Sequence, residues 1–104
     1  DAISPAEAVQ MINREKAVVI DVCESAEFSA GHVVGARSVP LATLEGSKGL
    51  PTNKTLPVVL VCASGARARR AAATVRGLGH QRVHVLQGGM AGWRAAGLPV
   101  EKSA

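Results

Sequence analysis

A cysteine followed by small residues and then an arginine is the stretch of this chain best suited to chemistry. Cys62 comes directly after the apolar run Val58–Val61. Four small residues separate it from Arg67, namely Ala63, Ser64, Gly65 and Ala66. Small residues let a backbone curl so that successive N–H groups point inward, and such a nest binds anions. The sulfur of Cys62 is the natural anion for the centre of this loop.

Two positive groups should strengthen that preference. The Ala- and Arg-rich stretch 68–78 predicts a helix whose N-terminus faces the loop, and the guanidinium of Arg67 comes just before it. Loops of this kind lower the pKa of a cysteine by about one to several units from about 8.5. We weigh the resulting thiolate nucleophile against an inert cysteine buried at a strand end. The small residues and the arginine favour the nucleophile, because an inert cysteine needs neither.

Asp21 and Cys23 should lie beside this loop. The β-branched run 17–20 ends at Asp21, and the carboxyl ends of parallel strands meet at one edge of a sheet. We interpret Asp21 as structural, with a nearby arginine as its candidate partner. Cys23 is either a small apolar filler, which we favour, or a resolving thiol that reacts with Cys62. Ser64 either donates a hydrogen bond to the bound anion or faces solvent in a turn.

Strands and helices should alternate along the whole chain. Apolar runs predict buried strands at 17–20, 57–61 and 83–86 and a shorter strand within 35–40. Ser4, Pro5 and Glu7 have the spacing of a capping box that starts the first helix. Ser25 is the predicted N-cap of a second, short helix, which Gly31 ends.

The rest of the chain continues this pattern. A helical turn at 41–44 precedes a polar loop, and glycines end the helix 68–78. A last helix follows Gly88-Gly89 and runs through Trp93. The alternation predicts an α/β fold in which a mostly parallel central sheet has helices on both faces. At this length we expect one domain covering residues 1–104.

The composition limits the classes of function. The chain has 104 residues, a net charge of +4 and two cysteines, and 47% of it is apolar. The excess of arginine suits an anionic substrate or an acidic partner. Nucleic-acid binding is not expected, because Phe28 and Trp93 are the only rings of their kind for base stacking. Neither the cysteines nor the histidines have metal-ligand spacing, so no metal is expected.

Three observations bear on location. No apolar run approaches the ~20 residues that a membrane-spanning helix needs, so no membrane partner is expected. The chain begins at Asp1 without an initiator Met or a basic-then-apolar leader. Two cysteines are too few for a disulfide scaffold, which favours a reducing compartment. We therefore expect a cytoplasmic protein.

Three stretches of the chain resemble the rhodanese family, and they follow one another as they do in that family, over about residues 3–99. The loop 62–67 matches the family's pattern of a Cys, two residues, a Gly, one residue and an Arg after a buried strand. The other matching segments are Asp21-Val22, Glu27-Phe28, Gly31-His32-Val33-Val34-Gly35-Ala36 and Gly88-Gly89-Met90 with Trp93. Cys23 departs from the family, which usually has an Arg there to brace carboxylates such as Glu27.

The resemblance implies a rhodanese-like three-layer domain with thiosulfate-type sulfurtransferase activity and no cofactor. Cys62 would take a sulfane sulfur from thiosulfate or from a persulfide and pass it to cyanide or a thiol. The implied partners are a small anionic donor and a thiol acceptor, and a persulfide-carrying protein is a further candidate. The loop backbone would hold the persulfide, Arg67 would help to bind the donor, and Asp21 would support the loop.

Two alternatives remain. Rhodanese-like domains also occur as inactive binding or regulatory modules, although those usually lose the cysteine that this chain keeps at position 62. Cysteine phosphatases and arsenate reductases of related shape place five residues between Cys and Arg, whereas this loop has four. It also lacks an evident general acid for a phosphate leaving group. The sequence therefore favours the sulfurtransferase.

Overall fold

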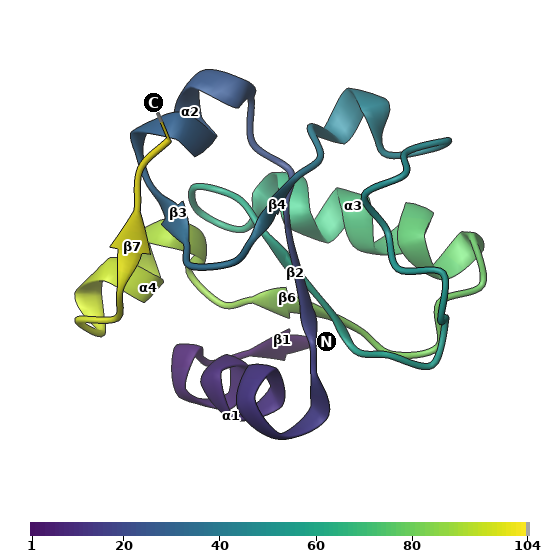
Figure 1. Ribbon diagram of the computed structural model, residues 1–104, viewed down its shortest axis with the longest axis horizontal. Coiled ribbons are helices and arrows are strands. Elements are labelled where there is room, and N and C mark those ends of the chain that lie inside the picture. The colour runs from purple at the N-terminus through teal and green to yellow at the C-terminus, as the bar shows by residue number, and fades with distance from the viewer. Residues whose placement is uncertain (104) are drawn as a thin grey trace.

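The centre of the molecule is a five-stranded sheet in which every pairing is parallel (Figure 1). The structure is a computed structural model that describes residues 1–103. The strand order is β1-β6-β5-β2-β4. These strands are β1 (Ala2–Ile3), β2 (Val18–Asp21), β4 (Arg37–Ser38), β5 (Val58–Val61) and β6 (Val83–Leu86). The prediction of an α/β fold with a mostly parallel sheet is confirmed.

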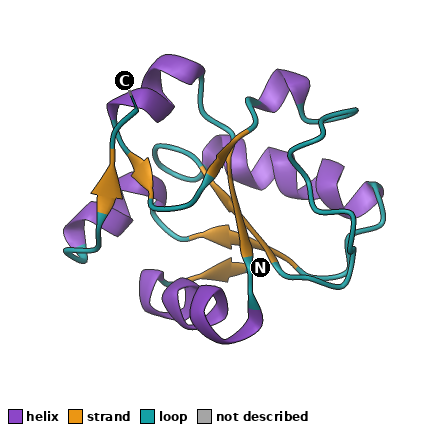
Figure 2. Cartoon of the chain, in the orientation of Figure 1, coloured by secondary structure: helices purple, strands orange, loops and turns teal. Residues whose placement is uncertain are grey.

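Helices cover both faces of this sheet, as Figure 2 shows, so the fold has three layers. The helices are α1 (Pro5–Glu15), α2 (Ser25–Ala30), α3 (Ala66–Gly77) and α4 (Gly89–Ala95), with a 3-10 turn η1 (Leu41–Thr43). Successive strand residues point to opposite faces. Leu60 therefore packs in the core with α3, whereas its neighbours Val59 and Val61 pack with α1 and α4. This alternation explains why β5 is apolar at every position.

A second, two-stranded sheet lies beside α4 and pairs β3 (His32–Val33) with β7 (Val100–Glu101) in antiparallel fashion (Figure 1). His32 anchors this corner: its Nδ1 contacts the Phe28 carbonyl oxygen at 2.7 Å and its Nε2 lies 3.3 Å from the Glu101 carboxylate. The sequence predicted neither this sheet nor β1. Each of these strands has only two residues, which is too short for a recognisable hydrophobic pattern.

The predicted helix starts are right for α1 and need correction for α2 and α3. Ser4 caps α1, with Glu7 completing the capping box. The N-cap of α2 is Glu24, not Ser25, because the Glu27 carboxylate accepts the Glu24 N–H at 3.0 Å. Helix α3 begins at Ala66, two residues earlier than predicted. Ala66 and Arg67 therefore belong to the first turn of a helix and not to a loop.

Candidate functional site

The sulfur of Cys62 lies within the first turn of α3, at the carboxyl end of β5. Cys62 is 1% exposed, and its Sγ accepts the Gly65 N–H at 3.0 Å and the Ala68 N–H at 3.4 Å. Gly65 has a φ of 115°, a left-handed conformation that other residues rarely adopt. This turn directs its N–H toward the sulfur. Two N–H donors and a helix N-terminus make the position suited to a negatively charged sulfur.

Helix α4 holds the other side of the loop. The Met90 N–H donates to the Cys62 carbonyl oxygen at 2.8 Å, and the Ala91 N–H donates to the Ala63 carbonyl oxygen at 3.2 Å. Both bonds use carbonyls of the loop, so they attach its first two residues to α4. The start of α4 thus fixes which way the loop backbone points.

Gly89 permits this close approach, and it is a site residue that the sequence analysis did not identify. Its φ is 56°, and a Cβ built there would overlap the Cys62 carbonyl oxygen and lie 2.7 Å from the Ala63 carbonyl oxygen. No other amino acid fits without moving the backbone. The signal in the sequence was the Gly88-Gly89 pair after a strand, which indicated a turn but not what the turn touches.

Arg67 pairs with Glu27 on α2. Its Nη1 and Nη2 donate to the two carboxylate oxygens at 2.6 and 2.8 Å, a bidentate ion pair between side chains that are 32% and 42% exposed. The hydrogen bond from Arg67 lowers the pKa of Glu27 to about 2, and the same bond raises the pKa of Arg67. Arg67 therefore ties the start of α3 to α2. Its direct contact with a donor stays a prediction.

Asp21 lies at the same edge of the sheet as Cys62, as expected. It pairs in register with Val61 and is 1% exposed. Its Oδ1 accepts the Cys23 N–H at 2.9 Å, and burial raises its pKa. Among residues 1–103 no arginine forms an ion pair with it, so the role it plays is to fix the turn after β2.

The thiol of Cys23 is buried beside Asp21 in an environment that opposes ionisation. Cys23 is 3% exposed, and burial, followed by the hydrogen bond and charge of Asp21, raises its pKa to about 12. Both Cys23 and Cys62 are free thiols. Cys23 thus has the surroundings of a neutral thiol.

A pocket of about 340 Å³ opens next to the loop, between α2 and α4. Ala63 supplies the loop's part of its wall, and Cys23, Glu27 and Arg94 supply side chains from three other segments. Ala63, Ser64 and Ala66 are exposed, so they form the rim of the site. A small molecule could reach the loop from this pocket.

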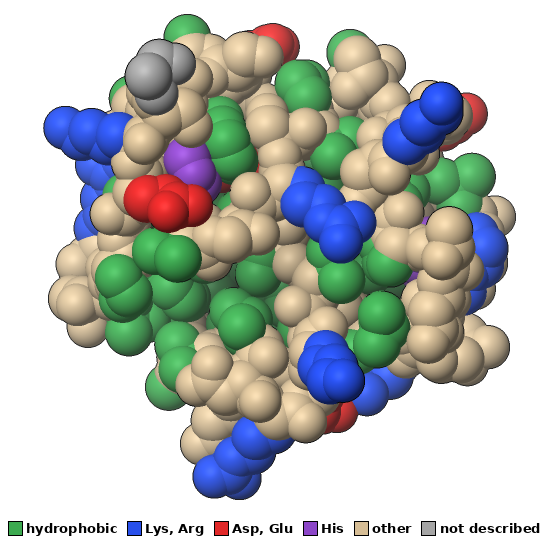
Figure 3. Space-filling model, viewed as in Figure 1, with side chains coloured by type: hydrophobic (Ala, Val, Ile, Leu, Met, Phe, Trp, Pro, Cys, Tyr) green, Lys and Arg blue, Asp and Glu red, His purple; other side chains and the backbone are tan. Residues whose placement is uncertain are grey.

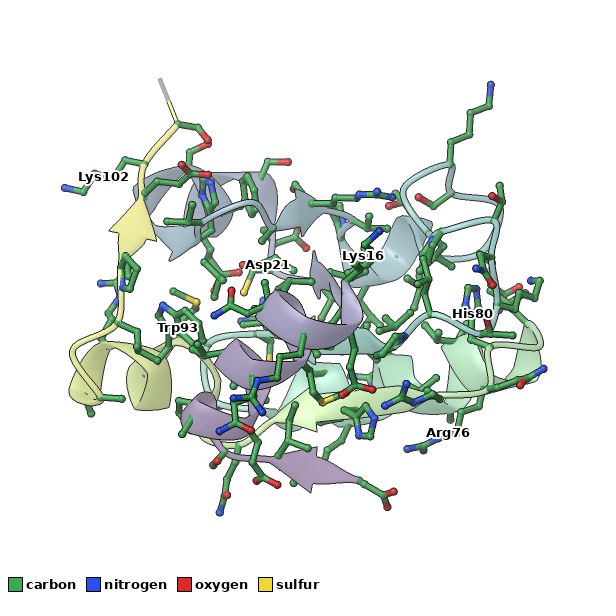
Figure 4. The ribbon with its side chains drawn as sticks, turned by 60° about the horizontal axis from the view of Figure 1, so that its bottom comes forward. Lys16, Asp21, Arg76, His80, Trp93 and Lys102 are labelled. Atoms are coloured by element: carbon green, nitrogen blue, oxygen red, sulfur yellow. The ribbon has the colours of Figure 1, made fainter. Side chains whose placement is uncertain are left out.

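Other polar and aromatic side chains are spread over the molecule. In Figure 4, His80 and Arg76 lie at one end of the molecule, whereas Asp21 is central and Trp93 lies toward the other end. Trp93 is buried, and its Nε1 donates to the Pro99 carbonyl oxygen at 2.9 Å, as an anchor for the last helix would. Within residues 1–103, no three His, Cys, Asp or Glu side chains gather as a metal would require. No helix in the same part of the chain has the length and apolarity to cross a membrane.

The parallel sheet and the site define an α/β domain in which a cysteine follows a central strand and its sulfur accepts N–H groups at a helix N-terminus. Residues 4–96 match the rhodanese-like domain, and the chain belongs to that family. It is 43% identical over 79 residues to the uncharacterized protein YqhL of Bacillus subtilis, covering 75% of this chain and 61% of YqhL. This chain therefore spans less than two thirds of that relative.

Relatives with a named activity are also similar. The thiosulfate sulfurtransferase GlpE of Pseudomonas putida is 34% identical over 94 residues, covering 89% of this chain and 84% of GlpE. The crystal structure of a thiosulfate sulfurtransferase from Pseudomonas aeruginosa superposes with a TM-score of 0.87 at 34% identity. That match covers 99% of this chain and 19% of the other. The expected family is thus confirmed.

Proposed function

We propose that this domain is a sulfurtransferase that carries a sulfane sulfur on Cys62. The observation that supports this most is the pair of N–H groups, from Gly65 and Ala68, that the Cys62 sulfur accepts. These donors stabilise a Cys62 thiolate before the reaction, and the persulfide, whose negative charge lies on the added outer sulfur, would lie beside the same helix N-terminus. The similarity to GlpE supports the same assignment.

The first half-reaction loads the cysteine. The Cys62 thiolate attacks the outer sulfur of thiosulfate, and a new S–S bond forms. The S–S bond of the donor breaks, and its electron pair leaves with sulfite. Charge and electrons balance without a cofactor, because the thiolate and the thiosulfate give a persulfide anion and sulfite.

The second half-reaction removes the outer sulfur from Cys62. Cyanide or a thiolate attacks the outer sulfur of the persulfide, the S–S bond to Cys62 breaks, and its electron pair returns to the cysteine as a thiolate. Thiocyanate or a new persulfide leaves. A low-molecular-weight persulfide or a persulfide-carrying protein could load Cys62 by the same exchange. We assign this exchange to a reducing compartment such as the cytoplasm, since both thiols are free.

The neutral thiol of Cys23 is a poor resolving nucleophile at physiological pH, since its pKa of about 12 leaves little thiolate. We therefore assign it a packing role beside Asp21. Arg67 orients α3 through Glu27, and this keeps the Ala68 N–H on the sulfur.

The test is the intact mass of the protein after incubation with thiosulfate. We expect the wild type to gain one sulfur atom, Cys62→Ser to gain none, and Cys23→Ser to gain it as the wild type does. Absence of an adduct in the wild type would contradict the sulfurtransferase and favour an inactive binding module. Hydrolysis of an aryl phosphate that depends on Cys62 would instead revive the phosphatase.

A further inference from the structure

Arg94 reaches across the pocket beside the active-site loop. It comes from α4 and lines this pocket of about 340 Å³ together with Ala63 of the loop. Its guanidinium lies against Gly31, at the end of α2, since a Cβ built at Gly31 would overlap Arg94 Nη2. The side chain therefore extends from one wall of the pocket to the other.

The positive charge of Arg94 has no partner in the described part of the chain. The ion pairs among residues 1–103 use Arg67, Arg82 and His32, and none uses Arg94. No hydrogen bond from its guanidinium is formed within the same residues either. Arginine carries five N–H donors in a planar arrangement that matches oxyanions. An exposed arginine over a pocket, with all of these donors free, can bind an anionic ligand.

The acid in the same pocket does not cancel this charge. Glu27 lines the pocket, but both of its carboxylate oxygens accept hydrogen bonds from Arg67. That bidentate pair is close to neutral as a unit. The net charge that the pocket offers a ligand is therefore the one positive charge of Arg94.

The proposed donor has two ends that need different partners. Its outer sulfur must meet the Cys62 sulfur at the loop, whereas its sulfonate oxygens carry negative charge that must not be buried unpaired. We propose that Arg94 binds the oxyanion end of the sulfur donor, so that the pocket is a subsite for thiosulfate and organic thiosulfonates. This rests on the proposed function for the identity of the donor. We assign this role to Arg94 and not to Arg67, because the guanidinium of Arg67 is already paired with the Glu27 carboxylate.

The first experiment measures the subsite without sulfur transfer. Iodoacetate and iodoacetamide alkylate the same thiol and differ in charge, so their rate ratio at Cys62, measured by peptide mass spectrometry, reports the local attraction for anions. We expect Arg94→Gln to lower this ratio about fivefold and Arg94→Lys to lower it less than twofold. The matched control is Arg14→Gln, which removes the same charge from the last turn of α1, near the opposite end of β2. It should leave the ratio unchanged.

The second experiment measures donor binding. A charge-assisted hydrogen bond to a ligand corresponds to about a tenfold or larger effect on affinity, so Arg94→Gln should slow persulfide formation from dilute thiosulfate about tenfold. Release of the sulfur from the preloaded variant to an uncharged thiol should change less than twofold. A saturating excess of thiosulfate should restore most of the loading rate, because the lost interaction is binding.

The two experiments separate the two proposals. If Arg94→Gln leaves both the alkylation ratio and the loading rate at their wild-type values, the subsite is overturned even though the wild type forms a persulfide. If the ratio falls but the wild type forms no persulfide, the anion subsite stands and the sulfurtransferase fails. Equal thermal melting of Arg94→Gln and Arg14→Gln would show that a change in the ratio is not a folding defect.

Discussion

Gly89→Ala tests whether the start of α4 holds the active-site loop. The added Cβ would overlap the Cys62 carbonyl oxygen, and the backbone at this position has a φ of 56°. A left-handed conformation costs a non-glycine residue about 1–2 kcal/mol. The overlap involves main-chain atoms, so the loop and α4 must separate. Separation weakens the bonds from Met90 and Ala91, each worth about 0.5–1.5 kcal/mol.

These contributions give an expected loss of about 3 kcal/mol in the free energy of unfolding, to be measured by chemical denaturation. A small domain of about 5–15 kcal/mol stability would remain folded. Displacement of the loop by about 1 Å should also slow persulfide formation by about 100-fold, measured by intact mass against time. We expect the loss of stability and the slower loading together, because the same hydrogen bonds stabilise the fold and direct the loop.

Gly97→Ala is the matched control. Gly97 has a φ of 72°, and a Cβ there would meet no atom within 4 Å. This variant carries the backbone strain without the overlap, so it should lose about 1 kcal/mol and keep its loading rate. If Gly89→Ala loses no more stability than Gly97→Ala and loads sulfur as fast as the wild type, then α4 does not hold the loop.

Three further predictions concern ionisation and packing. The ion pair of Glu27 with Arg67 should contribute its full stability above pH about 4.5 and lose it as the pH falls toward about 2. Glu27→Gln should lower the free energy of unfolding at neutral pH by at most about 1 kcal/mol, because the pair is exposed, and it should make stability depend less on pH in that range. Cys23, with a pKa of about 12, should be about one part in ten thousand thiolate at pH 8, so mass mapping should find it alkylated far more slowly than glutathione in the same mixture. Equal rates would contradict its raised pKa. Trp93→Phe should lower the unfolding free energy by about 1 kcal/mol, because the bond to the Pro99 carbonyl is lost; an unchanged denaturation midpoint would contradict the anchor.

The sequence predicted those parts of the fold and site that depend on neighbours along the chain. The run Val58–Val61 predicts a strand buried on both faces, and the structure has that strand. The small residues after it predict a tightly curled loop, and the structure places the Gly65 N–H on the Cys62 sulfur. Such signals are local, whereas the binding of an anion by this loop stays a prediction. The N-terminal capping box of α1 was also found for this reason, since Ser4 and Glu7 are three residues apart.

The missed features depend on contacts between distant residues. Arg67 and Glu27 are 40 residues apart, so the sequence showed a free arginine where the structure has an ion pair. Gly89 touches a loop 27 residues earlier, and β3 forms only because β7 returns to pair with it. Two-residue strands and backbone contacts of this kind leave no periodic pattern.

The molecule has a second hollow, lined by apolar side chains, which contrasts with the pocket beside the loop. Figure 3 shows hydrophobic side chains gathered at the lower left of the face in view. A groove between α1 and the end of α4 is lined by Val9, Ile12, Val34 and Leu98. The pocket with Arg94, by contrast, has the charged side chains of Glu27 and Arg94 in its lining. The two hollows therefore differ in the kind of molecule they suit.

The hydrogen bonds from α4 to the loop also have a consequence during protein synthesis. Cys62 and α3 leave the ribosome before Met90 and Ala91, which direct the Cys62 and Ala63 carbonyls. Strand β6 must first pair with β5 before α4 can reach the loop. A nascent chain that ends before β6 therefore has Cys62 without the hydrogen bonds from α4 to the loop carbonyls, and the loop takes its final arrangement only once α4 has been made.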